Sequence, residues 1–284
     1  MKLIPKGNRV LITGGASGFG KAMALKFAQQ GWRIYIADID VQQAKKTTLE
    51  LTAQGVEAHW VKCDISQPDD IQTMYDAVMA SWQGLDVLIN NAGIYSGGTI
   101  NEVDEATWLK VIDVNLVGTF RCCHKFVPLF QKQKTGRIVN IASLSGILPT
   151  PGSIHYAATK AAIVNLSQSL RHELKLYKVG VTVAAPNIFP TGIFSNGMIP
   201  NGSIKQSLET VMSYSDVTAD SVANSVFNAV MNDEFLVSTD LDTDIGWFLK
   251  ALDKAYTTSI ETLAFIAKSF DKKSQTKRKR KERQ

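Results

Sequence analysis

Cysteine is scarce in this sequence: Cys63, Cys122 and Cys123 are the only three among 284 residues. An odd count with one adjacent pair is not a disulfide framework, and the spacing does not suit a metal site. No apolar run reaches the ~18 residues that a membrane-spanning helix needs. The opening residues, MKLIPKGNRVLITGG, lack the long apolar core and cleavage site of a signal peptide. We therefore expect a soluble, cytoplasmic protein with reduced thiols and no metal.

A strong net charge is also missing from most of the chain. The formal charge is +5, from 31 Lys and Arg against 26 Asp and Glu. Residues 268–284 hold nine basic and two acidic residues, or +7, which leaves −2 for the rest of the chain. That balance does not indicate a nucleic-acid-binding fold. A hydrophobic fraction of 45% and a charged fraction of 20% exclude collagen-like, mucin-like and mostly disordered chains.

Short apolar runs alternate with helical patterns over the first 240 residues. The predicted strands are nearly apolar throughout, which is typical of strands covered on both faces. They are Arg9–Thr13, Arg33–Asp38, Glu57–Cys63, Val87–Asn90, Arg137–Ala142, Val181–Ala185 and Phe235–Ser238. The predicted helices are 18–30, 41–54, 68–82, 104–132, 156–178 and 218–231. This alternation predicts a doubly wound α/β fold, with about seven parallel strands and helices on both faces of the sheet. Four glycines follow predicted helices, where positive φ is favoured: Gly31, Gly55, Gly84 and Gly180.

Three regions fall outside this pattern. Residues 187–216 are rich in Pro, Gly, Asn and Ser, and a loop of that length is usually a lid, a binding loop or disordered. Residues 241–270 predict an amphipathic helix, and 271–284 a basic disordered tail. Residues 244–284 could make a peripheral contact with an anionic membrane. The alternatives are a helix packed on the body or in a dimer interface, with a solvated tail. We expect no specific nucleic-acid partner.

A glycine-rich turn follows the first predicted strand and leads directly into a helix. It reads TGGASGFG over residues 13–20, with Gly14, Gly18 and Gly20 in a GxxxGxG spacing. A pyrophosphate needs backbone N–H groups and a helix N-terminus at close range, which larger side chains would obstruct. The turn lacks the Gly-Lys-Ser/Thr of a P-loop. Dinucleotide binding and a ligand-free turn both fit this pattern.

Asp38 ends the second predicted strand, 24 residues after Gly14. In dinucleotide sites, an acidic residue near this offset hydrogen-bonds the 2′-hydroxyl of a ribose. A carboxylate at this position repels a 2′-phosphate, and no Arg or Lys occupies 15–19. NAD is therefore favoured over NADP. The alternative is that Asp38 is an ordinary turn residue at a strand end.

Four polar residues in the middle of the chain are candidates for chemistry. Tyr156 and Lys160 are four apart at the start of a predicted helix and share one face. Ser143 ends the strand RIVNIAS, where ligands collect in open α/β sheets. Asn115 lies in a predicted helix that follows NNAG at 90–93. Each observation alone is weak evidence.

Taken together, these elements resemble the short-chain dehydrogenase/reductase family over roughly residues 8–238. The matching elements are TGGASGFG, Asp64 after the third strand, NNAG, Asn115 in DVNLVG, Ser143, and YAATK at 156–160. The resemblance implies that residues 1–240 form a Rossmann-type catalytic domain that binds NAD(H). It further implies an alcohol dehydrogenase or carbonyl reductase that interconverts a secondary alcohol and a ketone. Members of the family commonly form homodimers or homotetramers through two long helices, equivalent here to 104–132 and 156–178.

The resemblance also implies roles for individual residues. Tyr156 is expected to be the acid–base group, with its pKa lowered by the Lys160 ammonium and a nicotinamide cation. Ser143 would hydrogen-bond the substrate oxygen, and Asn115 would hold a water that connects Lys160 to solvent. The expected cofactor contacts are Gly14, Ser17, Gly18, Phe19, Gly20, Asp38, Asp64, Ile65, Asn91, Ala92, Gly93, Tyr156, Lys160, Ile188 and Thr191.

One position departs from the family pattern. Asn187 follows Pro186, where the family usually has glycine. Because Asn tolerates positive φ better than most residues, the turn can survive the change. The Asn187 side chain nevertheless occupies space near the expected nicotinamide.

Apolar residues around the expected site favour a lipophilic substrate, although they could equally well pack the loop. The candidates for substrate contact, besides Ser143, are Tyr95, Leu144, Phe189, Phe194 and Met198. A different class of function is also open: a regulator or scaffold that binds NAD(H) without catalysis. The presence of all four residues of the catalytic set argues against that alternative.

Overall fold

The computed structural model describes residues 3, 7–148, 151–189, 193, 197–199, 206, 210 and 217–238. The chain divides into two units, Met1–Thr239 and Asp240–Gln284. The predicted C-terminal helix and basic tail belong to the second unit and lie outside the described residues. Most of the predicted loop at 187–216, in the first unit, also lies outside the described residues.

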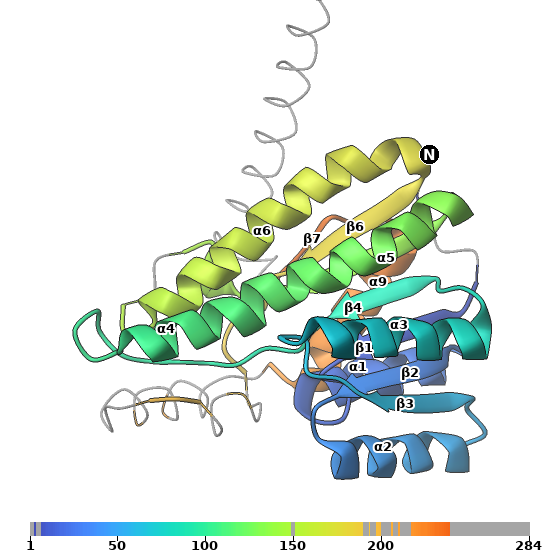
Figure 1. Cartoon of the computed structure of the whole chain (residues 1–284), viewed down its shortest axis with the longest axis horizontal. Helices are drawn as coiled ribbons and strands as arrows, with labels where there is room; N and C mark the ends of the chain where they lie inside the picture. Colours follow the sequence, from blue (N-terminus) through green and yellow to red (C-terminus); the bar gives the residue numbers. More distant parts are fainter. Residues whose placement is uncertain are drawn as a thin grey trace, which may run out of the picture. The chain divides into compact units, whose positions relative to one another are not determined.

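Seven parallel strands form one sheet in the order β3-β2-β1-β4-β5-β6-β7 (Figure 1). Their bounds are β1 Arg9–Thr13, β2 Arg33–Asp38, β3 Ala58–Lys62, β4 Val87–Asn90, β5 Gly136–Ile141, β6 Val179–Ala184 and β7 Leu236–Val237. The order reverses between β1 and β4, as in doubly wound sheets. The predicted fold is confirmed, with every predicted strand present.

The sheet is buried on both faces because its strands send alternate side chains to opposite sides. Val10 and Ile12 of β1 pack in one hydrophobic cluster and Leu11 in the other. The first cluster includes residues of α1 (Gly18–Gln29), α2 (Val41–Ala53) and α9 (Ala219–Asn232). The second includes residues of α3 (Pro68–Trp82), α5 (Thr119–Gln133) and α6 (Ile154–Leu174). Figure 1 shows these two groups of helices on opposite faces of the sheet.

The predicted helix over 104–132 is three segments in the structure. α4 spans Glu105–Ile112, a π-helix spans Asp113–Gly118, and α5 begins at Thr119. Asp104 caps α4, since its side chain accepts a hydrogen bond from the Thr107 amide. π-helical turns inside longer helices are frequent at functional sites. This one contains Asn115.

Of the four glycines predicted to have positive φ after a helix, two do and two do not. Gly31 and Gly55 adopt positive φ (78° and 81°), as predicted. The left-handed residues after α3 and α6 are instead Gln83 and Lys178. A Cβ at Gly84 would lie 2.6 Å from Nη1 of Arg9, and one at Gly180 would lie 2.5 Å from Cζ of Arg137. These two glycines therefore make room for guanidinium groups.

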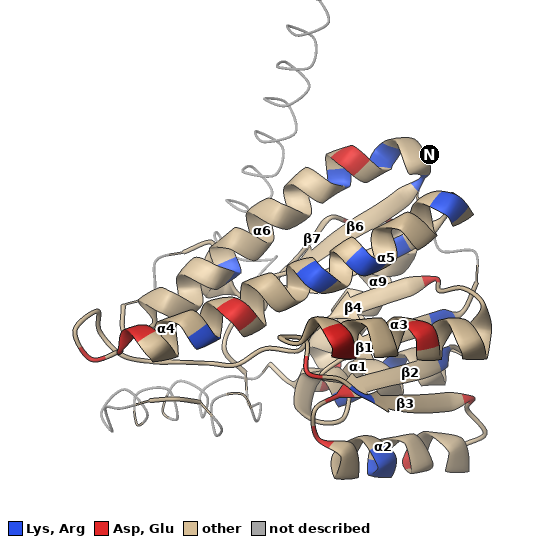
Figure 2. Ribbon diagram, viewed as in Figure 1, with Lys and Arg blue, Asp and Glu red and all other residues tan. Residues whose placement is uncertain are grey.

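Charged side chains of both signs are distributed over the helices in Figure 2. Acidic residues occupy the beginnings of α2 and α3, where Asp40 is the N-cap and Asp69 and Asp70 lie in the first turn. Among the described residues, no helix combines the length and the apolar character that crossing a membrane requires.

Candidate functional site

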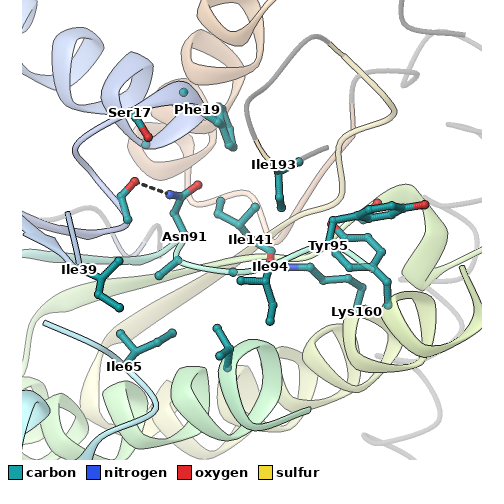
Figure 3. Close-up of a pocket in the computed structure, with 18 of the residues that line it drawn as sticks. Ser17, Phe19, Ile39, Ile65, Asn91, Ile94, Tyr95, Ile141, Lys160 and Ile193 are labelled. Carbon is teal, nitrogen blue, oxygen red and sulfur yellow. Dashed lines mark hydrogen bonds between the residues drawn. The ribbon is translucent and has the colours of Figure 1, made fainter. Parts of the chain in front are cut away.

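A pocket of about 730 Å³ opens where the parallel strands end. The segments that follow β1 to β6 all contribute to its lining, as expected for a ligand site in an open α/β sheet. In Figure 3, Ile39 and Ile65 lie toward one end, Ser17 and Phe19 border another side, and Tyr95 and Lys160 lie at the opposite end. The pocket is thus elongated, with the predicted catalytic lysine at one end.

The glycine-rich turn has the close backbone packing that its composition predicts. Gly14 and Gly18 have positive φ (62° and 51°). A Cβ on Gly20 would clash with the Gly14 carbonyl oxygen, so α1 can start directly above the turn only with glycine there. Ser17 is the N-cap of α1, but its side chain makes no capping hydrogen bond. The first N–H groups of α1 therefore remain available to an anion in the pocket.

Carboxylates line the part of the pocket beyond β2 and β3. Asp38 is buried, and its two oxygens accept hydrogen bonds from the amides of Ala16 (2.9 Å) and Asp40 (3.0 Å). An ionised carboxylate oxygen has more than one acceptor position, so Asp38 can also accept from a ligand hydroxyl. Asp64 lines the pocket with Ile65, and its Oδ1 accepts from Ser66. Among the described lining residues, the only cations are Lys110 and Lys160.

The NNAG segment joins β4 to the glycine-rich turn. Asn91 donates from Nδ2 to the carbonyl oxygens of Thr13 and Gly14, both at 3.0 Å. Thr13 Oγ1 in turn accepts from the amides of Asn91 and Ala92. Asn91, Ala92 and Gly93 all line the pocket. Asn91 therefore has a structural role, because its side-chain amide joins the end of β4 to the end of β1.

Tyr156 and Lys160 project from the first turns of α6 into the floor of the pocket, as one face of a helix requires. The phenol of Tyr156 is hydrogen-bonded to the hydroxyl of Ser143, which follows β5. Lys160 is buried, lies 5.5 Å from the centroid of the Tyr156 ring, and donates from Nζ to the Ile141 carbonyl at 2.9 Å. Ser145 Oγ lies 3.0 Å from Ser143 Oγ. The three predicted residues are thus brought together.

The expected lowering of the Tyr156 pKa does not arise from the chain alone. Burial raises the pKa of the Tyr156 phenol above its ordinary value; the hydrogen bond from Ser143 lowers it, and nearby Tyr95 raises it. Burial also lowers the pKa of Lys160 to about 8. The Lys160 ammonium donates to the Ile141 carbonyl, and burial is the largest influence on the pKa of the phenol. Spacing along the sequence does not show how deeply the two groups are buried.

Asn115 lies beneath the pocket within the π-helix and is buried. Both ends of its amide bind the backbone of Ile94: Oδ1 accepts from the Ile94 amide at 2.8 Å, and Nδ2 donates to the Ile94 carbonyl at 2.9 Å. Nδ2 also lies 3.3 Å from Thr159 Oγ1. A Cβ on Gly93 would come within 3.1 Å of Asn115 Oδ1 and 3.7 Å of Lys160 Nζ. Asn115 thus fixes the segment after β4 close to Lys160.

Only some of the residues predicted to contact substrate line the pocket. Tyr95 and Phe189 line the pocket; Tyr95 packs against Tyr156 with ring centroids 5.0 Å apart, and Phe189 against Phe19 at 5.4 Å. Ile188, predicted to contact the nicotinamide, is also a lining residue. Leu144 and Met198 are described but are not among the lining residues. Thr191 and Phe194 lie outside the described residues.

The turn at Asn187 does not use the conformation that the sequence suggested. Among the described residues with positive φ, Asn187 is absent. Its Oδ1 accepts from the Ile188 amide at 2.7 Å, and the Pro186 carbonyl accepts from the Leu144 amide at 2.9 Å. The segment therefore turns without a glycine, and Asn187 lines the pocket as predicted for its side chain.

Several lining residues escaped the sequence argument. They are mostly apolar or lie on segments next to predicted ones: Ile39, Asp40, Cys63, Ser66, Ile94, Lys110, Asp113, Val114, Ile141, Ala142 and Ile193. Most follow the end of a strand, which is a signal that could have identified them. Lys110, Asp113 and Val114 come from α4 and the π-helix rather than from the end of a strand.

Known proteins are similar to this chain in sequence and in fold. The chain matches the short chain dehydrogenase family over residues 8–198. It is 33% identical over 177 residues, 62% of this chain and 72% of the relative, to the 3-oxoacyl-[acyl-carrier-protein] reductase FabG of Staphylococcus aureus. It is 32% identical over 242 residues, 85% of this chain and 96% of the relative, to the 2,5-dichloro-2,5-cyclohexadiene-1,4-diol dehydrogenase LinX of Sphingobium indicum.

Two solved structures are also similar. One is a short chain dehydrogenase/reductase from Burkholderia phymatum in complex with NAD (TM-score 0.79, 28% identity, covering 93% of this chain and 96% of that one). The other is a short-chain dehydrogenase from Sphingobium yanoikuyae in complex with NADPH (TM-score 0.76, 26% identity, covering 89% and 95%). With a family match over more than half of its length, the chain belongs to the short-chain dehydrogenases, a family of oxidoreductases.

Proposed function

We propose that this chain is an NAD(H)-dependent oxidoreductase that interconverts a secondary alcohol and a ketone. One observation carries the proposal: the phenol of Tyr156 is hydrogen-bonded to Ser143 on the floor of the pocket, with the Lys160 ammonium beside its ring. A hydroxyl pair of this kind can hold one substrate oxygen from two sides. General acid–base catalysis requires that geometry before it requires any particular pKa.

The residues present fit a nicotinamide dinucleotide. The bare backbone at Gly14 and Gly20 and the uncapped start of α1 suit a pyrophosphate, and Asp38 can accept from ribose hydroxyls. We assign Asp64 and Ile65 to the adenine, and Lys160 to the nicotinamide ribose. When bound, such a cofactor supplies or accepts the hydride.

The chain itself handles the proton. During reduction Tyr156 donates its hydroxyl proton to the substrate oxygen, and during oxidation it removes that proton from the alcohol. Ser143 donates a hydrogen bond to the same oxygen and so stabilises the developing negative charge. The pKa of Lys160, lowered by burial to about 8, makes this ammonium a suitable proton source for Tyr156 near neutral pH. Asn115 keeps the segment of Ile94 in place beside Lys160.

Charge around Asp38 favours NAD over NADP. A 2′-phosphate next to the ribose would approach a buried carboxylate that already serves two backbone amides. Asp40 and Asp64 also line the pocket, and no arginine does so among the described residues. The solved relatives contain either NAD or NADPH, so the preference of this chain follows from its own residues.

We further propose a lipophilic substrate. The lining of the pocket includes Ile94, Tyr95, Phe189 and Ile193, whose side chains are apolar or largely so. Burial of such surface favours an apolar ligand by roughly 25 cal/mol per Å². Turnover limited to small polar sugars, with no activity on aliphatic or cyclic ketones, would contradict this part of the proposal.

The decisive test is Tyr156→Phe, measured with NADH and NADPH on a panel of carbonyl compounds. Because only the hydroxyl is removed, NADH binding should be unchanged while turnover falls by roughly 10²–10⁴-fold. Tyr75→Phe is the matched control, since Tyr75 packs against Phe126 away from the pocket. A wild-type protein that binds NADH but reduces no member of the panel would instead support a regulator or scaffold.

A further inference from the structure

Ser96 joins two segments that are far apart in the sequence. It follows Tyr95 at the catalytic end of the pocket, is fully buried, and pairs with Met198 in an isolated parallel bridge. The Met198 amide donates to the Tyr95 carbonyl at 3.0 Å, and the Met198 carbonyl accepts from the Gly97 amide at 3.1 Å. The segment 197–199 is thereby held against the backbone of a pocket residue.

Side chains extend this pairing to the catalytic helix. Ser96 Oγ donates to the Met198 carbonyl at 3.1 Å, and His155 Nε2 lies 2.9 Å from the same Oγ. A serine hydroxyl has one proton. Since that proton is given to Met198, the hydrogen bond to His155 must be a donation from Nε2–H to the serine oxygen. The order of donation is therefore His155 to Ser96 to Met198.

The position of His155 on α6 allows its hydrogen bond to Ser96. His155 has no role in the proposed reaction itself. It precedes Tyr156 on α6, is 2% exposed, and packs edge-on against Trp108 with centroids 6.1 Å apart. Burial lowers the pKa of its imidazole, which a backbone hydrogen bond with Ser96 partly offsets. A buried imidazole that is hydrogen-bonded to Ser96 is a rigid support for that residue.

The hydrogen-bond chain ends beside the acid–base residue. Met198 holds the backbone of Tyr95, and the Tyr95 ring packs against the Tyr156 ring at 5.0 Å. A second bridge, Gly98 with Ser153, joins the same strand-like segment to the residue before α6, with the Gly98 amide donating to the Gly152 carbonyl at 2.7 Å. Three parts of the chain thus meet around Tyr95, which borders the substrate end of the pocket.

We propose that His155 and Ser96 are positioning residues that hold Met198 against Tyr95 and so set the affinity for substrate. They do not touch the reacting atoms, and the expected effect is on the substrate KM, with kcat little changed. The kinetic consequence rests on the proposed oxidoreductase function. The structural consequence, loss of the Met198 pairing, does not.

The structural arm of the test is amide hydrogen exchange in Ser96→Ala, resolved for Gly97 and Met198. Loss of one hydrogen bond from the Met198 carbonyl should accelerate exchange at both amides by roughly 5- to 10-fold. Ser167→Ala is the matched control, because Ser167 is equally buried and its Oγ donates to the Ile163 carbonyl. Unchanged exchange in Ser96→Ala would overturn the proposal whether or not the protein is an enzyme.

The kinetic arm compares Ser96→Ala, His155→Leu and His155→Gln. The first two should raise the substrate KM by roughly 5-fold or more, with kcat and NADH affinity within about 2-fold of wild type. His155→Gln should restore KM, since a glutamine amide can donate where Nε2–H does. A fall in kcat at constant KM, or failure of the glutamine to rescue KM, would contradict a positioning role. Absence of turnover in the wild type would refute the proposed function. The exchange data would then be the only test of the hydrogen bonds from His155 through Ser96 to Met198.

Discussion

Lys160 shows how a single buried residue can make stability depend on pH. Burial lowers its pKa from 10.5 to about 8, so the folded protein releases this proton at lower pH than the unfolded chain does. Between pH 8 and 10.5 the unfolded state binds more protons, and the free energy of unfolding contributed by this group therefore rises with pH. Below pH 8 the full cost of burying the ammonium, roughly 3 kcal/mol, is present.

Lys160→Met should remove this dependence. Urea unfolding of wild type and variant at pH 7.5 and 9.5 measures it: the stability of the wild type relative to the variant should increase at the higher pH. The buried thiols Cys63 and Cys123, whose pKa values burial raises to about 12, act in the opposite direction but are common to both proteins. Lys175→Met, at a solvent-exposed position, is the control. An equal stability difference at both pH values would contradict the expectation.

We expect the choice of cofactor to depend on a single residue, Asp38. Asp38→Asn removes the charge that repels a 2′-phosphate while keeping the shape and one acceptor oxygen. We expect the ratio of NADH to NADPH affinity to fall by roughly 10-fold or more, since each 1.4 kcal/mol is one decade. Fluorescence titration with both cofactors measures this ratio. Asp40→Asn, which neutralises a neighbouring lining residue that caps α2, should lower the ratio by less than Asp38→Asn does.

At the scale of elements, one buried ion pair connects the end of α9 to the central sheet. Arg137 of β5 is fully buried; it donates from Nη2 to Asp233 Oδ1 at 2.5 Å and from Nη1 to Thr182 Oγ1 at 3.0 Å. Asp233 ends α9 with a φ of 62°. Its second oxygen accepts from the Leu3 amide at 2.8 Å. The pair lies at the starts of β5 and β6, away from the pocket.

Asp233→Ala should therefore lower the free energy of unfolding by about 3–5 kcal/mol, because a buried guanidinium loses its counter-ion. Urea denaturation measures the loss. Asp233→Asn separates charge from backbone, since Asn also tolerates positive φ but is neutral. Asp233→Asn should therefore lower the free energy of unfolding by less than Asp233→Ala does. Arg137 Nη2 also donates to the Leu3 carbonyl at 2.6 Å. A cost below about 1 kcal/mol for the alanine variant would contradict the expectation and show that the hydrogen bonds to Thr182 and Leu3 suffice without the carboxylate.

At the scale of the whole molecule, we propose that the chain forms a homo-oligomer through α4, α5 and α6. Leu109 and Phe120 are large apolar side chains on these helices and are 55% and 51% exposed. Phe120→Glu should therefore shift gel-filtration elution toward a smaller species, because a carboxylate in an apolar contact is costly to desolvate. Leu176→Glu, at a residue 88% exposed beyond α6, should not change the elution volume. Identical elution of Phe120→Glu and wild type would contradict the proposed interface.

Local patterns in the sequence were sufficient for the order of strands and helices, for the glycine-rich turn and for the family. Apolar, β-branched runs favour buried strands, and the predicted strand bounds differ from the structure by at most two residues, as for β6. The helix predicted over 156–178 agrees less well, since α6 ends at Leu174. Short-range spacing made Ser143, Tyr156 and Lys160 candidates, because strand ends and a shared helix face are local features. Their catalytic roles came from the resemblance to the family.

The tertiary structure decided everything that depends on distant neighbours. Gly84 and Gly180 accommodate guanidinium groups that no local pattern reveals, and Lys110 of α4 lines the pocket although no motif indicates it. The raised pKa of Tyr156 reflects burial, and the contact between His155, Ser96 and Met198 joins residues up to 102 positions apart. Desolvation and long-range hydrogen bonds are properties of the packed chain, so spacing along the sequence could predict the candidate catalytic residues but not their electrostatics or their supports.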